Sequence, residues 1–177
     1  NKMERFSSAI RFSGFTITIK DTIFLRNGFL TELNDEFEKS LNHISAQYIE
    51  LGKIKLTENQ GKIGGTFFLY SDFGAATHFY GENLEFSNNT SVYSSFCVDE
   101  LPHLIFEFTN SFVRNNAAEL QGGFGRFISA TIEVHPYEVL FTNVLFSNNS
   151  GRNAGVFYIG TLLTSYKLKE CIFIFNK

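Results

Sequence analysis

The chain has 177 residues, a formal net charge of −3 and 44% hydrophobic residues. This length and apolar content suffice for one sizeable domain and exclude a globally disordered chain. The chain is slightly acidic, so its net charge does not favour binding to nucleic acid. No apolar run is long enough for a membrane-spanning helix.

The apolar residues are unusual in kind, because the chain contains 22 Phe, one Met and no Trp. Phe is common in strands and stacks readily in a repeated interior, whereas a helical protein relies more on Leu and Met. The composition therefore favours an all-β protein.

The N-terminal part of the chain alternates in the manner of a strand. Phe15, Ile17 and Ile19 lie two residues apart and are followed by Phe24. A period of two predicts an extended segment with one buried face.

Residues 31–46 do not follow this alternation with a period of two. Leu33, Phe37, Leu41 and Ile44 fall at helical spacing, so the pattern predicts a short amphipathic helix over 33–45 or a loop excursion. Such a helix would either bind a partner or lie as a lid on its own domain, and the lid is the favoured interpretation.

From residue 49 onward the chain is strand and turn. The longest alternation is carried by Leu104, Phe106, Phe108, Asn110 and Phe112, and it predicts that these side chains share one face.

A Phe-x-x-Asn pattern recurs along the chain at intervals of 32, 30, 26, 34 and 27 residues. Its first positions are Phe24, Leu56, Phe86, Phe112, Phe146 and Phe173, and its last positions are Asn27, Asn59, Asn89, Asn115, Asn149 and Asn176. A period of this length indicates stacked units that bury their apolar faces against each other. One register remains open, because the Phe-Thr-Asn sequences at 108–110 and 141–143 would align Phe112 with Leu145 instead of Phe146.

Four repeats continue with a pair of small residues, namely Gly64-Gly65, Ser94-Ser95, Gly122-Gly123 and Ala154-Gly155. Each repeat of about 30 residues holds three short strands, which predicts a single-stranded right-handed parallel β-helix of about five to six coils. The Phe side chains would stack inside, the Asn side chains would form a ladder at a corner, and the small pairs would occupy a tight bend.

The Phe-x-x-Asn pattern, together with the Gly-Gly pairs, resembles the repeats of polymorphic outer-membrane proteins and related pectin-lyase-like surface proteins. The resemblance covers residues 50–176 and, more loosely, 15–49, although Thr66 and Phe124 follow the Gly-Gly pairs where that family prefers Ala. It implies a surface-displayed, adhesive β-helix.

The same architecture serves polysaccharide lyases and hydrolases, which need clustered carboxylates for acid–base catalysis. The acidic residues here are scattered, so the sequence predicts no catalytic residue and no cofactor. A column of His78, His103 and His135 could bind a metal, but two of these residues adjoin Pro102 and Pro136 at bends, which favours surface turn positions and no metal site.

Asn88 and Asn148 begin Asn-Asn-Thr and Asn-Asn-Ser sequons at the same repeat position. Asn89 also begins a sequon, but it is a ladder residue, so glycosylation is predicted on Asn88 and Asn148. Sugar there would place the chain in an extracellular glycoprotein.

These patterns together predict a non-enzymatic structural or adhesive segment, one β-helix over 1–177, cut from a longer surface-exposed or extracellular protein. Neighbouring coils, other subunits or glycans would be its partners, since the open ends are unpaired edges. Two alternatives stay open: a carbohydrate-active enzyme whose site is built from loops, including 31–46, and an intracellular scaffold subunit of a large assembly. Cys97 and Cys171 occupy different repeat positions, which favours free thiols.

Overall fold

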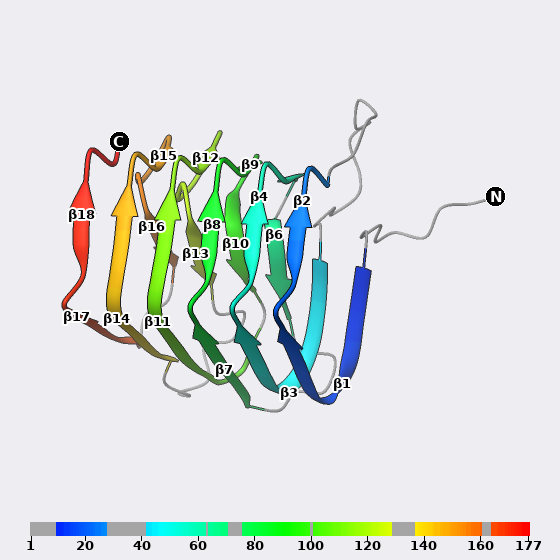
Figure 1. Ribbon diagram of the computed structural model, residues 1–177. Coiled ribbons are helices and arrows are strands. Elements are labelled where there is room, and N and C mark those ends of the chain that lie inside the picture. The colour runs from blue at the N-terminus through cyan, green and yellow to red at the C-terminus, as the bar shows by residue number, and fades with distance from the viewer. Residues whose placement is uncertain are drawn as a thin grey trace.

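The computed structural model describes residues 10–27, 42–62, 64–70, 76–99, 101–128, 137–160 and 164–177. These residues form a parallel β-solenoid whose chain winds right-handed along a single axis, as nearly all parallel crossovers do (Figure 1). Its strands are β1 (Ile10–Lys20), β2 (Ile23–Leu25), β3 (Asn42–Gly52), β4 (Lys55–Thr57), β5 (Gln60–Gly61), β6 (Gly64–Leu69), β7 (Thr77–Glu82), β8 (Glu85–Ser87), β9 (Thr90–Ser91), β10 (Ser94–Val98), β11 (Leu104–Arg114), β12 (Ala117–Ala118), β13 (Gly125–Ile128), β14 (Tyr137–Ser147), β15 (Ser150–Gly151), β16 (Phe157–Gly160), β17 (Thr164–Lys169) and β18 (Ile172–Ile174).

The predicted all-β parallel solenoid is confirmed, with a slightly different coil count. Four full coils are formed by β3–β6, β7–β10, β11–β13 and β14–β16, and a partial coil lies at each end, β1–β2 and β17–β18. About five to six coils were expected, so the difference lies in the incomplete end coils.

Residues 33–41 of the helix predicted over 33–45 lie outside the described residues. Its last residues, from Asn42 onward, belong to strand β3 and are not helical. Asn42–Ile44 pair in parallel with Phe67–Leu69 of β6, so the sheet satisfies their backbone and overrides the helical spacing of Ile44.

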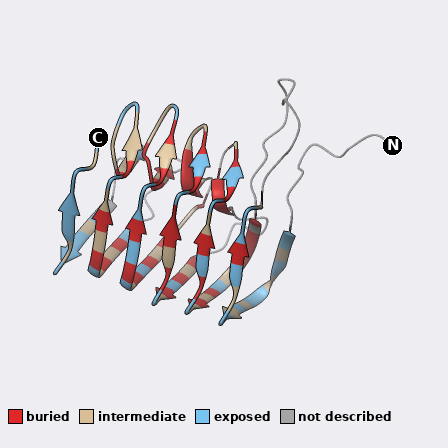
Figure 2. Ribbon diagram, turned by 45° about the horizontal axis from the view of Figure 1, so that its top comes forward, coloured by how far each residue is buried: buried red, intermediate tan, exposed pale blue. Residues whose placement is uncertain are grey.

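The core is a continuous stack of aromatic rings along the solenoid axis. Phe79 lies parallel to Phe106 with 4.5 Å between ring centroids, and Phe106 also contacts Phe96, Phe127 and Phe141. Figure 2 shows buried and exposed residues alternating along the strands of the full coils. Packed aromatic pairs of this kind add about 0.5–1.5 kcal/mol each beyond the burial of their area.

Each coil turns its corners through residues in the left-handed conformation. One column comprises Asp21, Lys53, Asn83, Asn110, Asn143 and Glu170, and a second comprises Arg26, Glu58, Asn88, Asn115, Asn148 and Phe175, all with φ between 49° and 56°. A left-handed residue interrupts the simple alternation of a strand. Asn is favoured at such positions because it tolerates this conformation better than other side chains.

The small-residue pairs lie where the backbones of successive coils approach closely. A Cβ on Gly65 would lie 2.7 Å from the carbonyl oxygen of Thr90, and a Cβ on Gly123 would lie 2.5 Å from that of Gly155. Both distances are too short for a side chain, so glycine is required at these two bends.

Candidate functional site

The most regular polar feature is a ladder of asparagines that runs along one corner and is fully buried in the inner coils. The Nδ2 of Asn116 donates to the carbonyl oxygen of Phe86 at 3.1 Å and to Oδ1 of Asn149 at 3.0 Å. Its Oδ1 accepts hydrogen bonds from the backbone N–H of Asn89 at 3.2 Å and from Nδ2 of Asn89 at 2.9 Å. The ladder comprises Asn27, Asn59, Asn89, Asn116, Asn149 and Asn176.

In one coil the ladder differs from the sequence alignment by one residue. The fourth position is held by Asn116 and not by Asn115, and the inner column holds Val113 where Phe112 was expected. The left-handed residue Asn110 shifts the alternation of β11, so Phe112 points outward and is 55% exposed. Phe24, Leu56, Phe86, Phe146 and Phe173 do occupy the inner column.

The signal that could have located the shift was present in the sequence. Aligning the two Phe-Thr-Asn sequences pairs Phe112 with Leu145, and β11 and β14 pair in that register. Phe112 therefore matches Leu145, and Val113 matches Phe146.

The two sequon asparagines lie outside the ladder. Asn88 and Asn148 are exposed residues of the second left-handed column, and the ladder residues Asn89 and Asn149, which follow them, are fully buried. Asn115 occupies the same column and donates from Nδ2 to Oδ1 of Asn88 at 3.1 Å. The outer corner therefore presents both predicted glycosylation sites to solvent.

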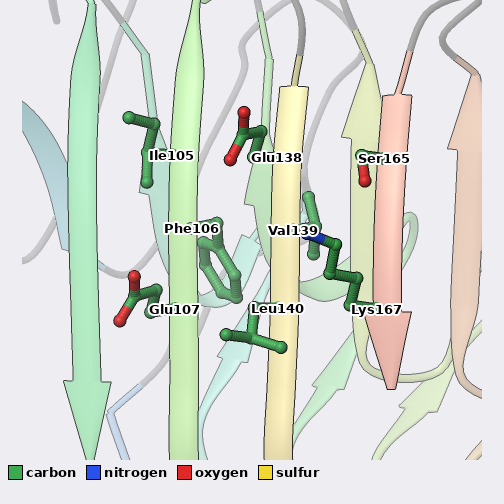
Figure 3. A pocket seen from close by; sticks show the side chains of 8 residues that line it. All are labelled: Ile105, Phe106, Glu107, Glu138, Val139, Leu140, Ser165 and Lys167. Atoms are coloured by element: carbon green, nitrogen blue, oxygen red, sulfur yellow. The ribbon is translucent and has the colours of Figure 1, made fainter. Parts of the chain in front are cut away.

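A shallow hollow lies on the lateral face formed by β11, β14 and β17 (Figure 3). Its charged lining residues are Glu107, Glu138 and Lys167, and none of their side chains forms a hydrogen bond or ion pair with another described residue. Figure 3 shows that the two carboxylates come from neighbouring strands and are not directed toward each other. The volume of about 70 Å³ is well below the roughly 300–1,000 Å³ of typical ligand pockets.

A second, more open hollow of about 250 Å³ adjoins Glu85. Burial acts to raise the pKa of Glu85, but hydrogen bonds and positive charge from Arg114 at 2.6 Å and Lys55 at 3.4 Å outweigh burial, so the pKa is lowered. Glu85 is therefore ionised at neutral pH and is unsuited to act as a general acid.

Exposed aromatic residues form a short strip on the other half of the same lateral face. Tyr48 contacts Phe15, with ring centroids 5.4 Å apart, and stacks on His78 at 5.1 Å. Phe15 is 65% exposed and Tyr48 is 46% exposed. His103 lies in a bend before β11, His135 falls outside the described residues, and no group of three potential metal ligands occurs among the residues that the structure describes.

A small apolar cluster lies on the outside of the sheet formed by β6, β10 and β13. Phe68 and Cys97 are buried there against Tyr70 and Tyr93. Arg126 forms an ion pair with Asp99 at 2.7 Å, and its guanidinium lies over the ring of Tyr93. Sequence reasoning missed this cluster because it predicted a single buried face for each strand.

The two thiols are expected to differ in reactivity toward iodoacetamide in the native protein. Burial raises the pKa of Cys97 well above its usual range, and Cys97 is fully buried, whereas Cys171 is partly exposed. The thiolate is the reactive form, so Cys171 should be alkylated at pH 8 at least tenfold faster than Cys97. Peptide mass spectrometry measures both rates, and in 8 M urea they should become similar. Equal labelling in the native state would contradict the described environment of Cys97.

The fold and its asparagine ladder define this chain as a parallel β-solenoid repeat protein. Comparisons with protein-family profiles, with curated proteins and with solved structures found no match. The resemblance to polymorphic outer-membrane proteins thus rests on the sequence motifs alone. Across the described part of the chain, no helix has the length and apolar character needed to span a bilayer.

Proposed function

We propose that this chain is a non-enzymatic structural or adhesive segment of a larger surface-exposed or extracellular protein. The observation that carries the proposal is the ladder, in which the amides of the four interior members, Asn59, Asn89, Asn116 and Asn149, are each engaged by the coil before and the coil after. Together with the stacked rings of the core, this makes a rigid rod from residues that recur in every coil. Such a rod serves as a spacer that displays its outward side chains at fixed intervals of about 4.8 Å.

The lateral face of β1, β3, β7, β11, β14 and β17 is the surface that fits an adhesive role. Its outward side chains include the exposed Tyr48 and Tyr80 and the charged groups of Glu107, Glu138 and Lys167, which have no ion pair with any residue that the structure describes. Exposed tyrosines near charged groups are common in protein interfaces. The small hollow in this face gives little support to the alternative of a carbohydrate-cleaving site, because about 70 Å³ holds a few water molecules but no sugar ring.

The proposal predicts glycosylation on Asn88 and Asn148 when the chain is secreted by a eukaryotic host. Both side chains are exposed at the corner, whereas the amide of Asn89 is buried and donates to Asn116 and to the carbonyl oxygen of Leu56. Intact mass before and after glycosidase treatment, followed by peptide mapping, locates any sugar. We expect sugar on Asn88 and Asn148 and none on Asn89.

Two outcomes of the mapping would count against the proposal in different ways. Bare asparagines in protein from its native source would favour an intracellular scaffold subunit of a large assembly. Sugar on Asn89 would contradict the burial of the ladder. An Asn88→Gln variant serves as the control, because it removes the predicted site and leaves the ladder residue in place.

A further inference from the structure

The full coils present two adjacent lateral faces of opposite chemical character. Figure 1 shows β3 and β7 in one row of strands and β4 and β8 in the next, while β11 and β14 continue from the first row into the second. The change of direction in β11 and β14 falls at the left-handed residues Asn110 and Asn143. The first lateral face comprises the outward side chains before this corner, and the second lateral face comprises those after it. Both faces run along the side of the rod.

The first lateral face is acidic. Its strand segments, 48–52, 77–82, 104–109 and 137–142, contain no Lys or Arg, and their outward carboxylates are those of Glu50, Glu82, Glu107 and Glu138. Glu50 pairs with Lys20 of β1 at 2.6 Å, whereas Glu107 has no ion-pair partner among the described residues. Lys167 of β17 lines the same hollow as Glu107, so the acidic character is strongest over β7 and β11.

A tyrosine lies at the centre of this acidic face. Tyr80 is 38% exposed and is aligned between Glu50 and Glu107 in one outward column. Exposed tyrosines often carry much of the binding energy of a protein interface, and the charged groups around them set the choice of partner. The first lateral face therefore suits a partner that offers an apolar recess with positive charge beside it.

The second lateral face of the same chain is basic and apolar. Its first outward column consists of Lys55, Glu85, Phe112 and Leu145, and Arg114 lies in the next column. Lys55 and Arg114 both bind Glu85, at 3.4 Å and 2.6 Å, so two cations share one carboxylate and an excess of positive charge remains. Phe112 is 55% exposed. This face thus combines an exposed ring with net positive charge.

The more open of the two hollows described above lies in the second lateral face. Its apolar lining comes from Leu84 and Phe112, and Lys53 and Lys55 supply positive charge beside Glu85. The side chain of Lys53 is 72% exposed and its nearest carboxylate, that of Asp21, lies 4.0 Å away. The volume of about 250 Å³ is below the roughly 300–1,000 Å³ of typical ligand pockets. The hollow is therefore better suited to one side chain of a protein partner than to a separate ligand.

The complementary features of the two faces lie at the same height along the rod. Tyr80 and Leu84 belong to the coil that begins with β7, and Glu107 and Arg114 both belong to β11. Two copies that lie side by side, with parallel axes and their coils level, would therefore bring the tyrosine to the hollow and the carboxylate to the guanidinium. Complementary charges at matched positions favour one partner and one register.

We propose that the first lateral face of one copy of this chain docks on the second lateral face of another copy. Tyr80 enters the hollow beside Phe112, and Glu107 faces Arg114. The inference rests on the proposed adhesive role of the first lateral face and names its partner as a second copy. Because the contact joins two different faces, each copy can bind one neighbour on each side.

Sedimentation velocity of the full chain without glycosylation, from micromolar to millimolar protein, tests the proposal. We expect oligomers that grow with protein concentration and are weaker at 0.5 M than at 0.05 M NaCl, because salt screens exposed opposite charges. Tyr80→Ala and Glu107→Arg should each raise the dissociation constant at least tenfold. Glu119→Arg makes the same charge change at an exposed residue after β12, outside both faces, and should leave it within about twofold. Circular dichroism establishes that each variant is folded.

A charge swap tests which residues meet. Arg114→Glu alone should weaken self-association as Glu107→Arg does, since each substitution opposes like charges in the contact. In an equimolar mixture of the two variants, every contact between unlike copies again pairs opposite charges at these positions. Association of the mixture should therefore return to within about threefold of the wild type. Tyr80→Ala leaves the ion pairs of Glu85 in place, so the contact remains testable if Arg114→Glu does not fold.

A wild-type chain that stays monomeric under all these conditions would overturn the proposal, and so would a mixture that associates no better than its components. The outcome is independent of the proposed location of the protein. Bare Asn88 and Asn148 in protein from its native source would refute the extracellular role without affecting sedimentation. A glycosylated chain whose unglycosylated form never associates would refute the self-docking and leave the extracellular segment in place.

Discussion

Replacing Asn116 by glycine is expected to lower the free energy of unfolding by about 3–5 kcal/mol. The substitution removes the acceptor of two donors on Asn89 and the donor to the carbonyl oxygen of Phe86 and to Oδ1 of Asn149. All of these groups lie in the interior of the ladder, where water cannot replace the lost partner. A buried polar group left without its hydrogen bond costs about 1–3 kcal/mol, so the loss of several such bonds at once is large.

The matched control is Asn115→Gly, one residue earlier in the same turn. Asn115 is exposed, has φ of 54°, and forms one exposed hydrogen bond to Asn88. Both variants share the backbone entropy cost of a new glycine, about 0.5–1 kcal/mol. At position 115 glycine also adopts the left-handed backbone conformation without strain. Urea titrations followed by circular dichroism give both free energies. If Asn115→Gly were the more destabilising change, the ladder would pass through Asn115, as the Phe-x-x-Asn alignment predicts.

Truncation of Phe106 to alanine is expected to destabilise the protein by about 3–5 kcal/mol, the range observed for buried aromatic residues. Phe106 is fully buried and contacts rings from β7, β10, β13 and β14. Its loss leaves a cavity in the middle of a stack whose neighbours are held in place by the sheet, so relaxation into the space is limited.

Phe112→Ala provides the control in the same strand. Phe112 is 55% exposed and is paired in register with Leu145 and Glu85, so its truncation should change stability by no more than about 0.5 kcal/mol. Thermal unfolding followed by circular dichroism measures both variants. Similar losses for the two residues would show that the alternation of β11 continues unbroken past Asn110, contrary to the described shift at that residue.

The repeated motif was sufficient to predict the parallel solenoid, because Phe and Asn at a fixed interval have few other structural uses. Assigning the fourth coil required more than the motif. Phe112 and Asn115 satisfy Phe-x-x-Asn by chance in a Phe-rich chain, while the left-handed conformation at Asn110 places Val113 and Asn116 inside. The backbone conformation of a single corner residue thus decides which of the two alternating sets of side chains in a strand is buried.

Two other features were beyond the reach of sequence patterns. The cluster of Phe68 and Cys97 lies on the outer faces of β6 and β10, two strands whose inner faces are also buried, so no alternation marks it. The charged hollow arises from Glu107, Glu138 and Lys167. Each of these residues lies about 30 residues after the one before it, and they are brought together only by the stacking of coils. Neither spacing resembles a known site motif.

The hydrogen bonds between coils, both in the sheets and in the asparagine ladder, run along the axis of the rod. A pulling force applied to the two ends of the rod therefore loads these bonds in the direction that separates one coil from the next, so that coils should peel away one at a time. Each released coil of about 30 residues can extend to roughly 100 Å, compared with a rise of about 4.8 Å when stacked. Under tension the chain would thus yield in long, repeated steps and behave as an extensible tether.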